Sequence, residues 1–486
     1  MAIPELVAGP EGDAGNSTGA QVASSVNAVI DAVEDAVSGN AALNAYLKSL
    51  RVDVQSPPVG FNWPAGLPEV IAYKNGDAYS CNIRPEDLID FSVFTNTQYV
   101  DINRPDSSGD GLSWATAEKG IGHAIDNAIA SGQPTRILVR GGIYPRAYSL
   151  CNANLTKTLT APISIESVYG DVTTGTFDDL TYTKTVGQDY VYQATRSNVG
   201  ALIDPSVSTL RANGKLYTLV SSIAECNSTQ GSFYTDATTL YVHSFDSSEV
   251  NNGNCIAALN AIGGSVFGNY DIYLSGLTLL GGSGGALEVK NGSTNTVVAN
   301  RCSFNLAVSG ASDSAQTPKD GVQILGCKLF AAFNCDASLN SKDGFNLHIQ
   351  GAVEPAMLTV NCTGFDNGQI VSASQSNNGI TVHDGLKAID IGSTWLGSVG
   401  TNAGHISDGT QVWHFGAIAG QSNGDVYNSG SINYGGFGVW SGAAEMWLDW
   451  CTDYSTSIGI TAGGTANAYV RNHSGTGARS GNITTY

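Results

Sequence analysis

Carboxylate side chains recur at short intervals in the second half of the chain, where two of them could act as the acid and base of glycoside hydrolysis. The candidates are Asp320, Asp343, Asp384, Asp408 and Glu445. Aspartate directly before glycine is also a turn signature, and we apply this alternative to Asp320, Asp343 and Asp408. Asp384 follows His383, and Glu445 lies close to Trp440, so we expect both to escape the turn explanation. We therefore take all of them except Asp320 as the set from which a catalytic pair comes.

Imidazole, aromatic and amide side chains in the same region could bind a sugar. Aromatic rings cover the apolar faces of pyranose rings, and amide or charged groups bond their hydroxyl groups. The predicted substrate-binding residues are Trp413, Trp440, Asn346, Gln411, Gln323 and Lys342, and the predicted catalytic set also includes His348 and His383. Each has a structural alternative, because an outward tryptophan can pack beneath a loop or at a subunit interface, and a single histidine can be a hydrogen-bonded surface residue.

Elimination from a uronic acid is the competing chemistry. It needs a base for the proton beside the carboxyl group and a cation, often Ca²⁺ or a basic side chain, that stabilises the enolate. The available groups are Lys342, His348, His383 and Lys387. No cluster of acidic residues has the spacing of a Ca²⁺ site, so the sequence predicts no metal site and leaves Ca²⁺ binding open.

These residues need a framework that brings distant parts of the chain together, and a repeated motif supplies one. A small or turn-forming residue, then glycine or alanine, then alternating apolar positions occur in six copies: GALEVK (285–290), DGVQIL (320–325), DGFNLH (343–348), NGITVH (378–383), DGTQVW (408–413) and GGFGVW (435–440). The glycine or alanine positions are 35, 23, 35, 30 and 27 residues apart. Repeats of this length predict an all-β fold in which the coils of a parallel β-solenoid, or β-helix, stack on one another.

Alternation within each copy predicts which side chains fill the interior. We expect inward positions at Val322, Ile324, Phe345, Leu347, Ile380, Val382, Phe437 and Val439. The opposite positions form two outward columns, one of Glu288, Gln323, Asn346, Thr381, Gln411 and Gly438 and one of Lys290, Leu325, His348, His383, Trp413 and Trp440. A second set of strands places Cys302, Cys327, Cys362, Ser393, Ser429 and Cys451 in one further column of small residues.

The stacking distance between coils predicts the spacing of carboxylates on them. Adjacent coils lie about 4.8 Å apart, so Asp320 and Asp343 would match the roughly 5–5.5 Å of retaining glycosidases. Asp343 and Asp408 would be about 9.6 Å apart if two coils separate them, which is the long end of the inverting range.

Composition limits the classes of protein to which the chain can belong. Its 486 residues include 59 glycines and only 13% charged residues, as in β-rich proteins. The net charge of −20 disfavours nucleic acid and anionic membranes as partners, and no apolar run is long enough for a membrane helix. The start MAIPELVAGPEGDAG lacks the pattern of a secretory signal. Nine cysteines without a CxxC motif predict buried thiols made in a reducing cytosol.

The chain divides into three predicted regions. Residues 1–50 begin with a flexible segment and continue with Val22, Val26, Val29 and Val33, whose β-branched seam predicts a short trimeric coiled coil. A single amphipathic helix packed on its own chain is the alternative. Residues 51–95 are rich in proline and predict an irregular neck. Residues 96–486 predict the β-helix, with an amphipathic helix near 114–131 that caps its open end.

Two sets of motifs resemble known proteins. GDGLSWATA (109–117), an amphipathic helix and RILVRGGIY (136–144) resemble the first segment of right-handed parallel β-helices of the pectate-lyase type. DGFNLH (343–348) and NGITVHDG (378–385), behind a short N-terminal helix and neck, resemble bacteriophage tailspike proteins that depolymerise host capsular polysaccharide or exopolysaccharide. The resemblance covers roughly residues 96–480. Many tailspikes end in an additional C-terminal module, whereas this sequence stops at TGARSGNITTY, a departure from that pattern.

The resemblance implies a homotrimer made in the bacterial cytoplasm, attached to the virion tail or baseplate through its N-terminus, and active outside the cell. It implies endo-acting hydrolysis of a host surface polysaccharide as the favoured activity. The alternatives are a polysaccharide lyase, a non-catalytic carbohydrate-binding adhesin, and a purely structural fibre that binds no sugar.

Overall fold

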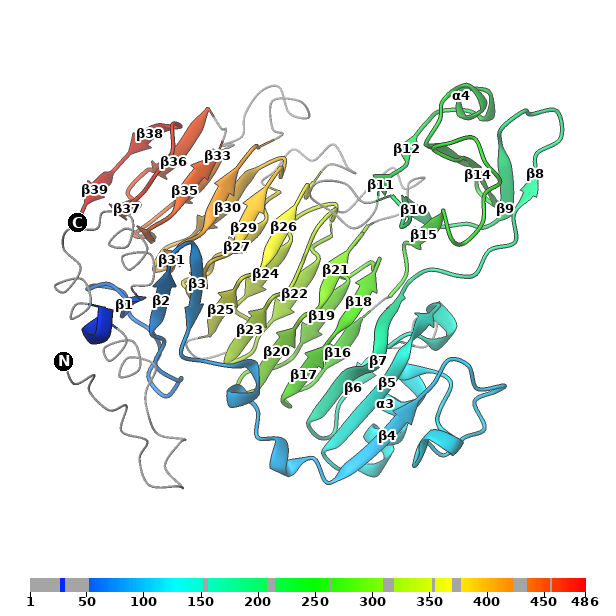
Figure 1. The fold of residues 1–486 in the computed structure, drawn as a ribbon, viewed down its shortest axis with the longest axis horizontal. Coiled ribbons are helices and arrows are strands. Elements are labelled where there is room, and N and C mark those ends of the chain that lie inside the picture. Colours follow the sequence, from blue (N-terminus) through cyan, green and yellow to red (C-terminus); the bar gives the residue numbers. More distant parts are fainter. Residues whose placement is uncertain are drawn as a thin grey trace.

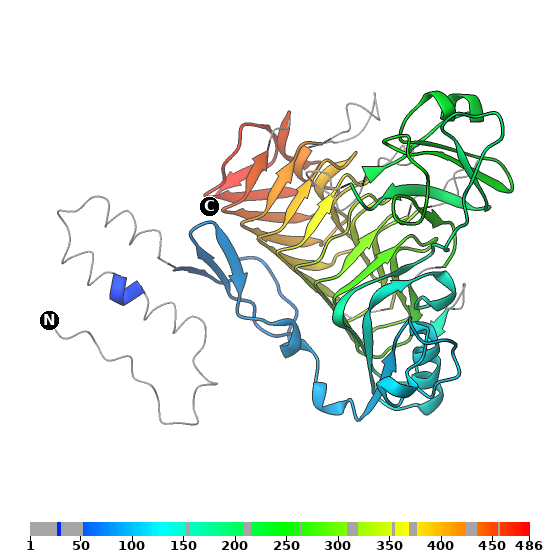
Figure 2. The ribbon, with the colours of Figure 1, turned by 45° about the vertical axis from the view of Figure 1, so that its right-hand side comes forward.

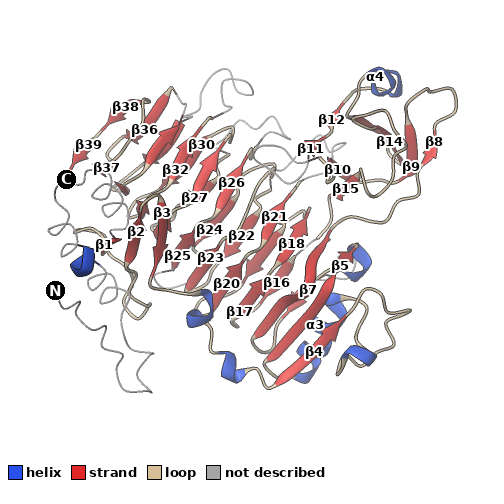
Figure 3. Cartoon of the chain, in the orientation of Figure 1, coloured by secondary structure: helices blue, strands red, loops and turns tan. Residues whose placement is uncertain are grey.

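Parallel strands dominate the structure. The computed structural model describes residues 27–30, 52–151, 156–207, 215–262, 264–308, 319–351, 355–368, 377–422, 435–454 and 457–486. Figure 1 and Figure 3 show strands stacked side by side along the long axis of the molecule, with the few helices at its periphery. The chain passes repeatedly through three sheets, which we call sheet 1, sheet 2 and sheet 3.

Sheet 1 and sheet 2 run the length of the stack, and all of their strand pairs are parallel. Sheet 1 contains β6 (Lys157–Thr158), β16 (Ser265–Phe267), β19 (Leu287–Lys290), β22 (Val322–Leu325), β24 (Phe345–His348), β27 (Ile380–Val382), β30 (Thr401–Ile406), β33 (Gly435–Trp440), β36 (Ile458–Gly463) and β38 (Ala478–Gly481). Sheet 2 contains β4 (Asn96–Val100), β5 (Thr135–Tyr144), β7 (Ile163–Gly175), β17 (Ile272–Ser275), β20 (Thr296–Asn300), β23 (Leu329–Phe333), β25 (Ala356–Val360), β28 (Lys387–Ile391), β31 (Gln411–Phe415), β34 (Glu445–Asp449), β37 (Asn467–Arg471) and β39 (Ile483–Thr485).

Sheet 3 is shorter. It contains β18 (Leu277–Leu280), β21 (Ser303–Asn305), β26 (Thr363–Phe365), β29 (Thr394–Leu396), β32 (Ile418–Gly420) and β35 (Thr452–Tyr454), and single bridges of Asp336 join β21 to β26. Successive strands such as β27, β28 and β29 belong to sheets 1, 2 and 3 in turn, so one circuit of the chain makes one coil. The mostly β composition and the long parallel sheets are consistent with a parallel β-helix. The handedness of the coils stays a prediction.

The interior of the stack is filled as the alternation predicts. All eight side chains expected to point inward from sheet 1 are 1% exposed or less. Phe345 packs edge-on against Phe304 and Trp395 of other sheets, with ring centroids 6.4 and 5.8 Å away. Burial of these apolar side chains is the main stabilising contribution to the coils.

A polar network also lies in the interior. His414 Nδ1 is 2.7 Å from Asp390 Oδ2, and its Nε2 is 2.8 Å from Nε2 of His405. Trp395 and Thr359 donate hydrogen bonds to the two oxygens of Asp390. Burial, followed by the neighbouring His414, lowers the pKa of His405 well below its ordinary value, so this imidazole remains neutral inside the stack.

The fifth copy of the repeat lies in sheet 2, whereas the repeat spacing predicts that it lies in the same sheet as the other copies. The structure places Gln411, Val412 and Trp413 on β31 of sheet 2, in register with β28 and β34. Their expected place in sheet 1 is taken by β30, whose sequence TNAGHI lacks the glycine-apolar pattern. The outward columns of sheet 1 therefore contain Gly404 and Ile406 in place of Gln411 and Trp413. Repeat spacing could not distinguish β30 from β31, because the sheet 1 strand and the sheet 2 strand of one coil have similar lengths and similar alternation.

The corner between sheet 2 and sheet 3 has a repeated backbone conformation. The residue after each of the eight sheet 2 strands from β17 to β37 is left-handed, with φ between 51° and 71°, at Gly276, Arg301, Asn334, Asn361, Gly392, Gly416, Trp450 and Asn472. Two residues after the ends of β20, β23, β25, β28, β31 and β34, the side chain is small: Cys302, Cys335, Cys362, Ser393, Ala417 and Cys451. The predicted column was wrong at Cys327, which lies elsewhere in its coil, and Ser429 lies outside the described residues. All nine cysteines are free, and all but the partly exposed Cys81 are buried.

A folded insertion interrupts the stack after β7, where the sequence predicted uninterrupted coils over 96–486. It contains β8 (Thr183–Lys184), β9 (Tyr192–Thr195), β10 (Val199–Asp204), β11 (Lys215–Leu216), β12 (Thr218–Leu219), α4 (Ile223–Ser228), β13 (Ser232–Thr235), β14 (Thr239–His243) and β15 (Ile256–Leu259). Most of its strands pair antiparallel, and Figure 2 shows it projecting beside the stack. The sequence did not reveal it, because its short alternating strands look like those of a coil.

The N-terminal regions pack as covers. The predicted capping helix is present as α3 (Ile121–Ser131), preceded by η3 (Trp114–Thr116) and followed by η4 (Arg146–Tyr148), and it buries Ile121, Ala124, Ile125 and Ala128 against the first coils. The predicted neck forms an antiparallel sheet of β1 (Val52–Gln55), β2 (Ala72–Asn75) and β3 (Ala78–Cys81), followed by η1 (Pro85–Leu88) and η2 (Phe91–Val93). Its apolar residues pack on the outer face of sheet 2.

The trimeric coiled coil falls mostly outside the described residues. Of its seam, only Val29 is described, in a helical segment of residues 27–30, where it is 39% exposed. Asn27 exchanges hydrogen bonds with the backbone of Val52, which links this segment to β1. The trimer stays a prediction. No helix within the described ranges is long and apolar enough to cross a membrane.

Substitution of Asn361 tests the repeated corner. This exposed residue has a φ of 51°, which a β-branched side chain adopts only with strain. We expect Asn361→Val to destabilise the protein by about 1–2 kcal/mol and the matched Asn361→Gly variant to change stability little. Thermal unfolding of both variants measures the difference, and equal unfolding temperatures would contradict the assignment of the corner.

Candidate active site on the outer face of sheet 1

Three consecutive coils bring seven charged or polar residues together on sheet 1. We call Asp320, Lys342, Asp343, Asn346, His348, His383 and Asp384 the polar cluster. Asp320 and Asp343 lie two residues before β22 and β24, whereas Asn346 and His348 lie on β24 and His383 follows β27 directly. In the strand register, Asn346 lies between Gln323 and Thr381. Four of the six residues proposed as catalytic from the sequence belong to this cluster.

Asp320 and Asp343 are joined through one amide group. Asn346 Nδ2 donates to Asp320 Oδ2 and to Asp343 Oδ2, each at 3.2 Å, so the two oxygens are at most twice that distance apart. The other oxygens have structural roles. Asp320 Oδ1 accepts from the backbone N–H of Asp343, and Asp343 Oδ1 accepts from that of Asn378 in the next coil. These two hydrogen bonds link neighbouring coils and do not close a local turn, so they differ from the turn role expected for both residues. The second oxygen of each aspartate faces the polar cluster.

Lys342 supplies the positive charge for this pair. Its Nζ is 3.2 Å from Asp320 Oδ1 and 3.6 Å from Asp343 Oδ2. Its side chain is 28% exposed, whereas both aspartates are almost completely buried. Burial alone would lower the pKa of Lys342, but the carboxylates of Asp343 and Asp320 raise it above its ordinary value. The ammonium group therefore stays charged at the surface end of the pair.

The Asp343 carboxyl group has an unusual protonation equilibrium. Burial raises its pKa to about 6, and the negative charge of Asp320 also raises it, although Lys342 opposes both effects. A carboxylic acid that holds its proton close to neutral pH can act as a proton donor. The pair thus contains one carboxyl group with the protonation behaviour of a general acid.

His348, His383 and Asp384 form the exposed end of the polar cluster. His383 Nδ1 is 2.9 Å from Asp384 Oδ1, and His348 Nδ1 is 3.3 Å from Asp384 Oδ2. The two imidazole rings are edge-on, with centroids 4.0 Å apart. His383 Nε2 is 2.9 Å from Asn346 Oδ1, which joins this end of the cluster to the aspartate pair.

Asp384 does not escape the turn explanation. Asp384 and Gly385 have φ values of 63° and 83°, and the Leu386 N–H donates to the carbonyl of His383. This is a tight turn with two left-handed central residues, for which aspartate followed by glycine is a favoured pair. The turn folds the Asp384 carboxylate back over both imidazoles.

Several predicted site residues lie elsewhere. Trp413 is completely buried beneath the neck on sheet 2, where its Nε1 donates to Asp449, so its expected exposure is wrong. Gln411 donates to Glu445 and accepts from the backbone of Asn62 on the same face. Asp408 is exposed in the turn after β30 and accepts from the Ala443 N–H. Asp408 lies after the end of β30, whereas Asp343 lies before the start of β24. The two residues are therefore at opposite ends of their strands, and the expected pair of Asp343 and Asp408 does not form.

Trp440 lies on sheet 1, three coils beyond His348 along the same outward column. Its ring lies flat on the sheet: a side chain placed at Gly438 or Gly463 would collide with it. Gln323, on the coil before Asn346, is half-buried and donates to Asp320 Oδ2. Both residues can reach a ligand that lies along the outer face of sheet 1.

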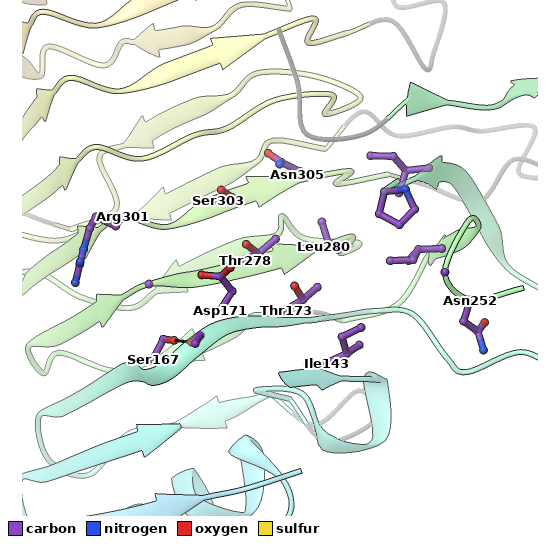
Figure 4. A pocket seen from close by; sticks show the side chains of 16 residues that line it. Ile143, Ser167, Asp171, Thr173, Asn252, Thr278, Leu280, Arg301, Ser303 and Asn305 are labelled. Carbon is purple, nitrogen blue, oxygen red and sulfur yellow. Dashed lines mark hydrogen bonds between the residues drawn. The ribbon is translucent and has the colours of Figure 1, made fainter. Parts of the chain in front are cut away.

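A cleft of about 850 Å³ lies between the insertion and the first coils. Figure 4 shows side chains of β7, β18 and β21, among them Asp171, Thr278 and Ser303, on one side and Asn252 of the insertion on the other. No sequence pattern indicates this cleft, because the strands of the insertion have the same local pattern as those of a coil. The cleft shares no residue with the polar cluster and offers a single carboxylate, Asp171. It suits binding, whereas hydrolysis by a carboxylate pair needs the cluster.

Comparison with known proteins identifies no family. No family model and no curated protein matches the chain. A structure described as a glycoside hydrolase is 8% identical over 80% of this chain and 96% of that chain, with a TM-score of 0.45. The complex of XylC with xylose is 9% identical over 78% and 70% (TM-score 0.43), and the Dettilon tailspike protein 13% over 80% and 68% (TM-score 0.36). Because these TM-scores are below 0.5, the fold assignment rests on the strand pairing of the chain itself.

The pH dependence of stability tests the coupling of Lys342 to Asp343. The pKa of Asp343 is raised in the folded protein, so its stabilising contribution is complete below the unfolded value and is lost as pH rises through about 6. Lys342→Met should raise this pKa further, and each unit costs about 1.4 kcal/mol once the group ionises. We expect the unfolding temperature of Lys342→Met to fall increasingly below that of the wild type as pH rises. The control Lys328→Met removes an exposed contact to the Gly66 carbonyl and should show a difference independent of pH.

Proposed function

We propose that this protein cleaves a polysaccharide by endo-acting hydrolysis on the outer face of sheet 1. Asp343 acts as the proton donor, and Asp320 is the carboxylate that acts as nucleophile or base. The observation that carries the proposal is the pair of aspartate oxygens from neighbouring coils held 3.2 Å from the same Asn346 nitrogen. Two carboxyl groups with different proton affinities are the usual requirement of this chemistry.

The spacing of the pair supports a retaining mechanism. The two oxygens that face Asn346 lie closer together than the roughly 6.5–9.5 Å that inverting enzymes use to accommodate a water molecule. Asp320 would then attack the sugar, and Asp343 would protonate the departing glycosidic oxygen. In the second step, Asp343 would remove a proton from the water molecule that releases the sugar from Asp320.

The environments of the two aspartates support different roles. Asp343 is the member whose pKa is raised to about 6, with burial as the largest cause. Asp320 accepts a second amide hydrogen bond, from Gln323, and has the shorter contact with Lys342. Asp343 therefore suits the role of proton donor, and Asp320, with its oxygen held by two amide groups, is the carboxylate left to attack the sugar.

A polysaccharide running along the stack would contact several coils. Trp440 lies three coil spacings, or about 14 Å, from His348 along one column. Its flat, partly exposed ring offers a stacking platform for a pyranose. Lys342 and Gln323 present polar groups next to the aspartate pair. This arrangement favours binding within a chain of sugars and therefore endo-acting cleavage.

The biological setting that we propose is a bacteriophage tailspike that acts on the capsular polysaccharide or exopolysaccharide of its host. The motifs in residues 109–144 and 343–385 support this setting, and the valine seam in residues 1–50 supports a homotrimer joined to the virion through its N-terminus. A non-catalytic adhesin and a polysaccharide lyase are the alternatives that the following experiment separates.

Replacement of the paired carboxylates tests hydrolysis directly. We expect Asp343→Asn and Asp320→Asn each to reduce cleavage of a susceptible bacterial polysaccharide by at least about 100-fold, because each removes a group that transfers a proton or attacks the sugar. Polymer length by gel filtration measures cleavage, and co-sedimentation with the polymer measures binding, which should persist. The matched control is Asp408→Asn, which removes an exposed carboxylate outside the cluster.

Two results would contradict this proposal. Polymer that keeps its length with the wild-type protein while remaining bound would identify an adhesin. Products with the ultraviolet absorbance of an unsaturated uronic acid would identify elimination instead of hydrolysis.

Trp440→Ala tests the binding surface. Loss of the stacking platform should weaken polysaccharide binding by roughly 1–3 kcal/mol, by analogy with aromatic stacking on nucleic-acid bases. The control is Tyr454→Ala, because Tyr454 is 49% exposed on sheet 3 and lies away from the proposed path. Equal affinity of the Trp440 variant and the wild type would show that the ring has only a packing role.

A further inference from the structure

The geometry points to a binding site for a divalent transition-metal ion formed by His348, His383 and Asp384. The candidate ligand atoms of the three residues all lie within 4.8 Å of one another. They come from two neighbouring coils, and both imidazoles turn their Nδ1 atoms toward the same carboxylate. The repeat pattern predicts His348 and His383 on adjacent coils, but no acidic cluster has the spacing of a Ca²⁺ site, so the sequence predicts no metal site.

Two of the distances between the ligand atoms match the edges of a coordination polyhedron. Zinc bonds to imidazole nitrogen and carboxylate oxygen are about 2.0–2.2 Å long. Two such bonds at angles near 90–110° place their ligand atoms about 2.9–3.5 Å apart. The observed separations are 2.9 Å for His383 Nδ1 to Asp384 Oδ1 and 3.3 Å for His348 Nδ1 to Asp384 Oδ2. The two imidazoles contact different oxygens of Asp384, so an ion bound to both rings would be held by this carboxylate through one or both of its oxygens.

Asn346 fixes which nitrogen of His383 carries a proton. Its Nδ2 donates to the carboxylates of Asp320 and Asp343, so its Oδ1 must be the atom that faces His383 Nε2 at 2.9 Å. An amide oxygen accepts and cannot donate, so His383 Nε2 carries hydrogen. In the neutral ring, Nδ1 is then an unprotonated acceptor that faces the carboxylate of Asp384. Two acceptors at 2.9 Å repel each other unless a cation, either a proton or a metal ion, lies between them.

The same contact is the usual support of a metal-binding histidine. Such a histidine typically donates its second N–H group to a carbonyl or carboxylate, which fixes the orientation of the ring. Asn346 performs this role for His383, while the left-handed turn at Asp384 and Gly385 holds the carboxylate in place. A simple surface ion pair would not require either arrangement.

The ligand set selects the class of metal. Two imidazoles and one carboxylate suit Zn²⁺, Co²⁺ or a similar ion of intermediate softness, whereas Ca²⁺ prefers a shell made only of oxygen. The side chains of His348 and Asp384 are 30% and 38% exposed, so solvent can supply the remaining ligands. The cluster also contains three carboxylates against one lysine, a charge balance that favours a divalent cation.

Metal titration of the untagged full-length chain tests this site. After treatment with a chelator, we expect the wild-type protein to bind one Co²⁺ ion with visible absorption bands of a protein-bound ion, and Zn²⁺ to displace it. His348→Gln and Asp384→Asn should each weaken Zn²⁺ binding at least 10-fold by calorimetry. Asn346→Leu removes the support of His383 together with the amide donor to Asp320 and Asp343, and it should weaken Zn²⁺ binding about 10–100-fold while every metal ligand remains.

Matched controls separate this site from general cation binding. His123→Gln and Asp408→Asn each remove a ligand-type side chain outside the cluster and should leave the affinity unchanged. Zn²⁺ should raise the unfolding temperature of the wild type and of both controls but not of Asp384→Asn, because an ion that binds only the folded state stabilises it. Binding that is absent, or equal in all variants, would overturn the proposal. A proton on His383 Nδ1 that persists at saturating Zn²⁺, detected by nitrogen NMR, would also overturn it.

The metal site and polysaccharide cleavage are tested separately. Metal binding is measured without a polysaccharide, and cleavage can be measured with and without chelator. Cleavage without metal binding would disprove only the metal site, and metal binding by a protein that leaves every polymer intact would disprove only the hydrolase.

Discussion

Parallel backbone pairing between successive coils is the constraint on which the rest of the structure depends. Each strand of sheet 1 must keep register with the strands before and after it, so equivalent side chains are repeated about every 4.8 Å. Gln323, Asn346 and Thr381 become neighbours for this reason, although they are distant in sequence. The same constraint requires a left-handed residue at each corner between sheet 2 and sheet 3, where asparagine or glycine is the usual occupant.

A single amide group organises the chemistry that this register brings together. Asn346 donates to Asp320 and Asp343 through one end and accepts from His383 through the other, which a carboxylate at this position could not do. The proton affinity of Asp343 and the tautomer of His383 are therefore parts of one hydrogen-bond network. The proposed hydrolytic pair and the proposed metal site share this residue but none of their reacting groups.

The covering segments explain why the polar cluster belongs to sheet 1. The neck packs apolar residues over sheet 2 and buries Trp413, while the insertion approaches sheet 3 and forms the cleft around Asp171. Among the described residues, the outer face of sheet 1 carries both the polar cluster and the flat ring of Trp440. Inside the stack, Asp390, His405 and His414 are completely buried and bond to one another, so this network has no path to a polymer.

The amino-acid sequence determined the all-β character, the inward positions of sheet 1 and the capping helix, because alternation and helical periodicity are local properties. It also placed Asp343, Asn346, His348 and His383 near one another, since their repeats share one register. It could not assign Gln411 and Trp413 to sheet 2 or recognise the insertion, because strands of different sheets have the same local pattern. Only the tertiary structure decided which carboxylates meet. Asp320 pairs with Asp343 because both bond across neighbouring coils through Asn346, and Asp384 meets two histidines because a tight turn folds it over them.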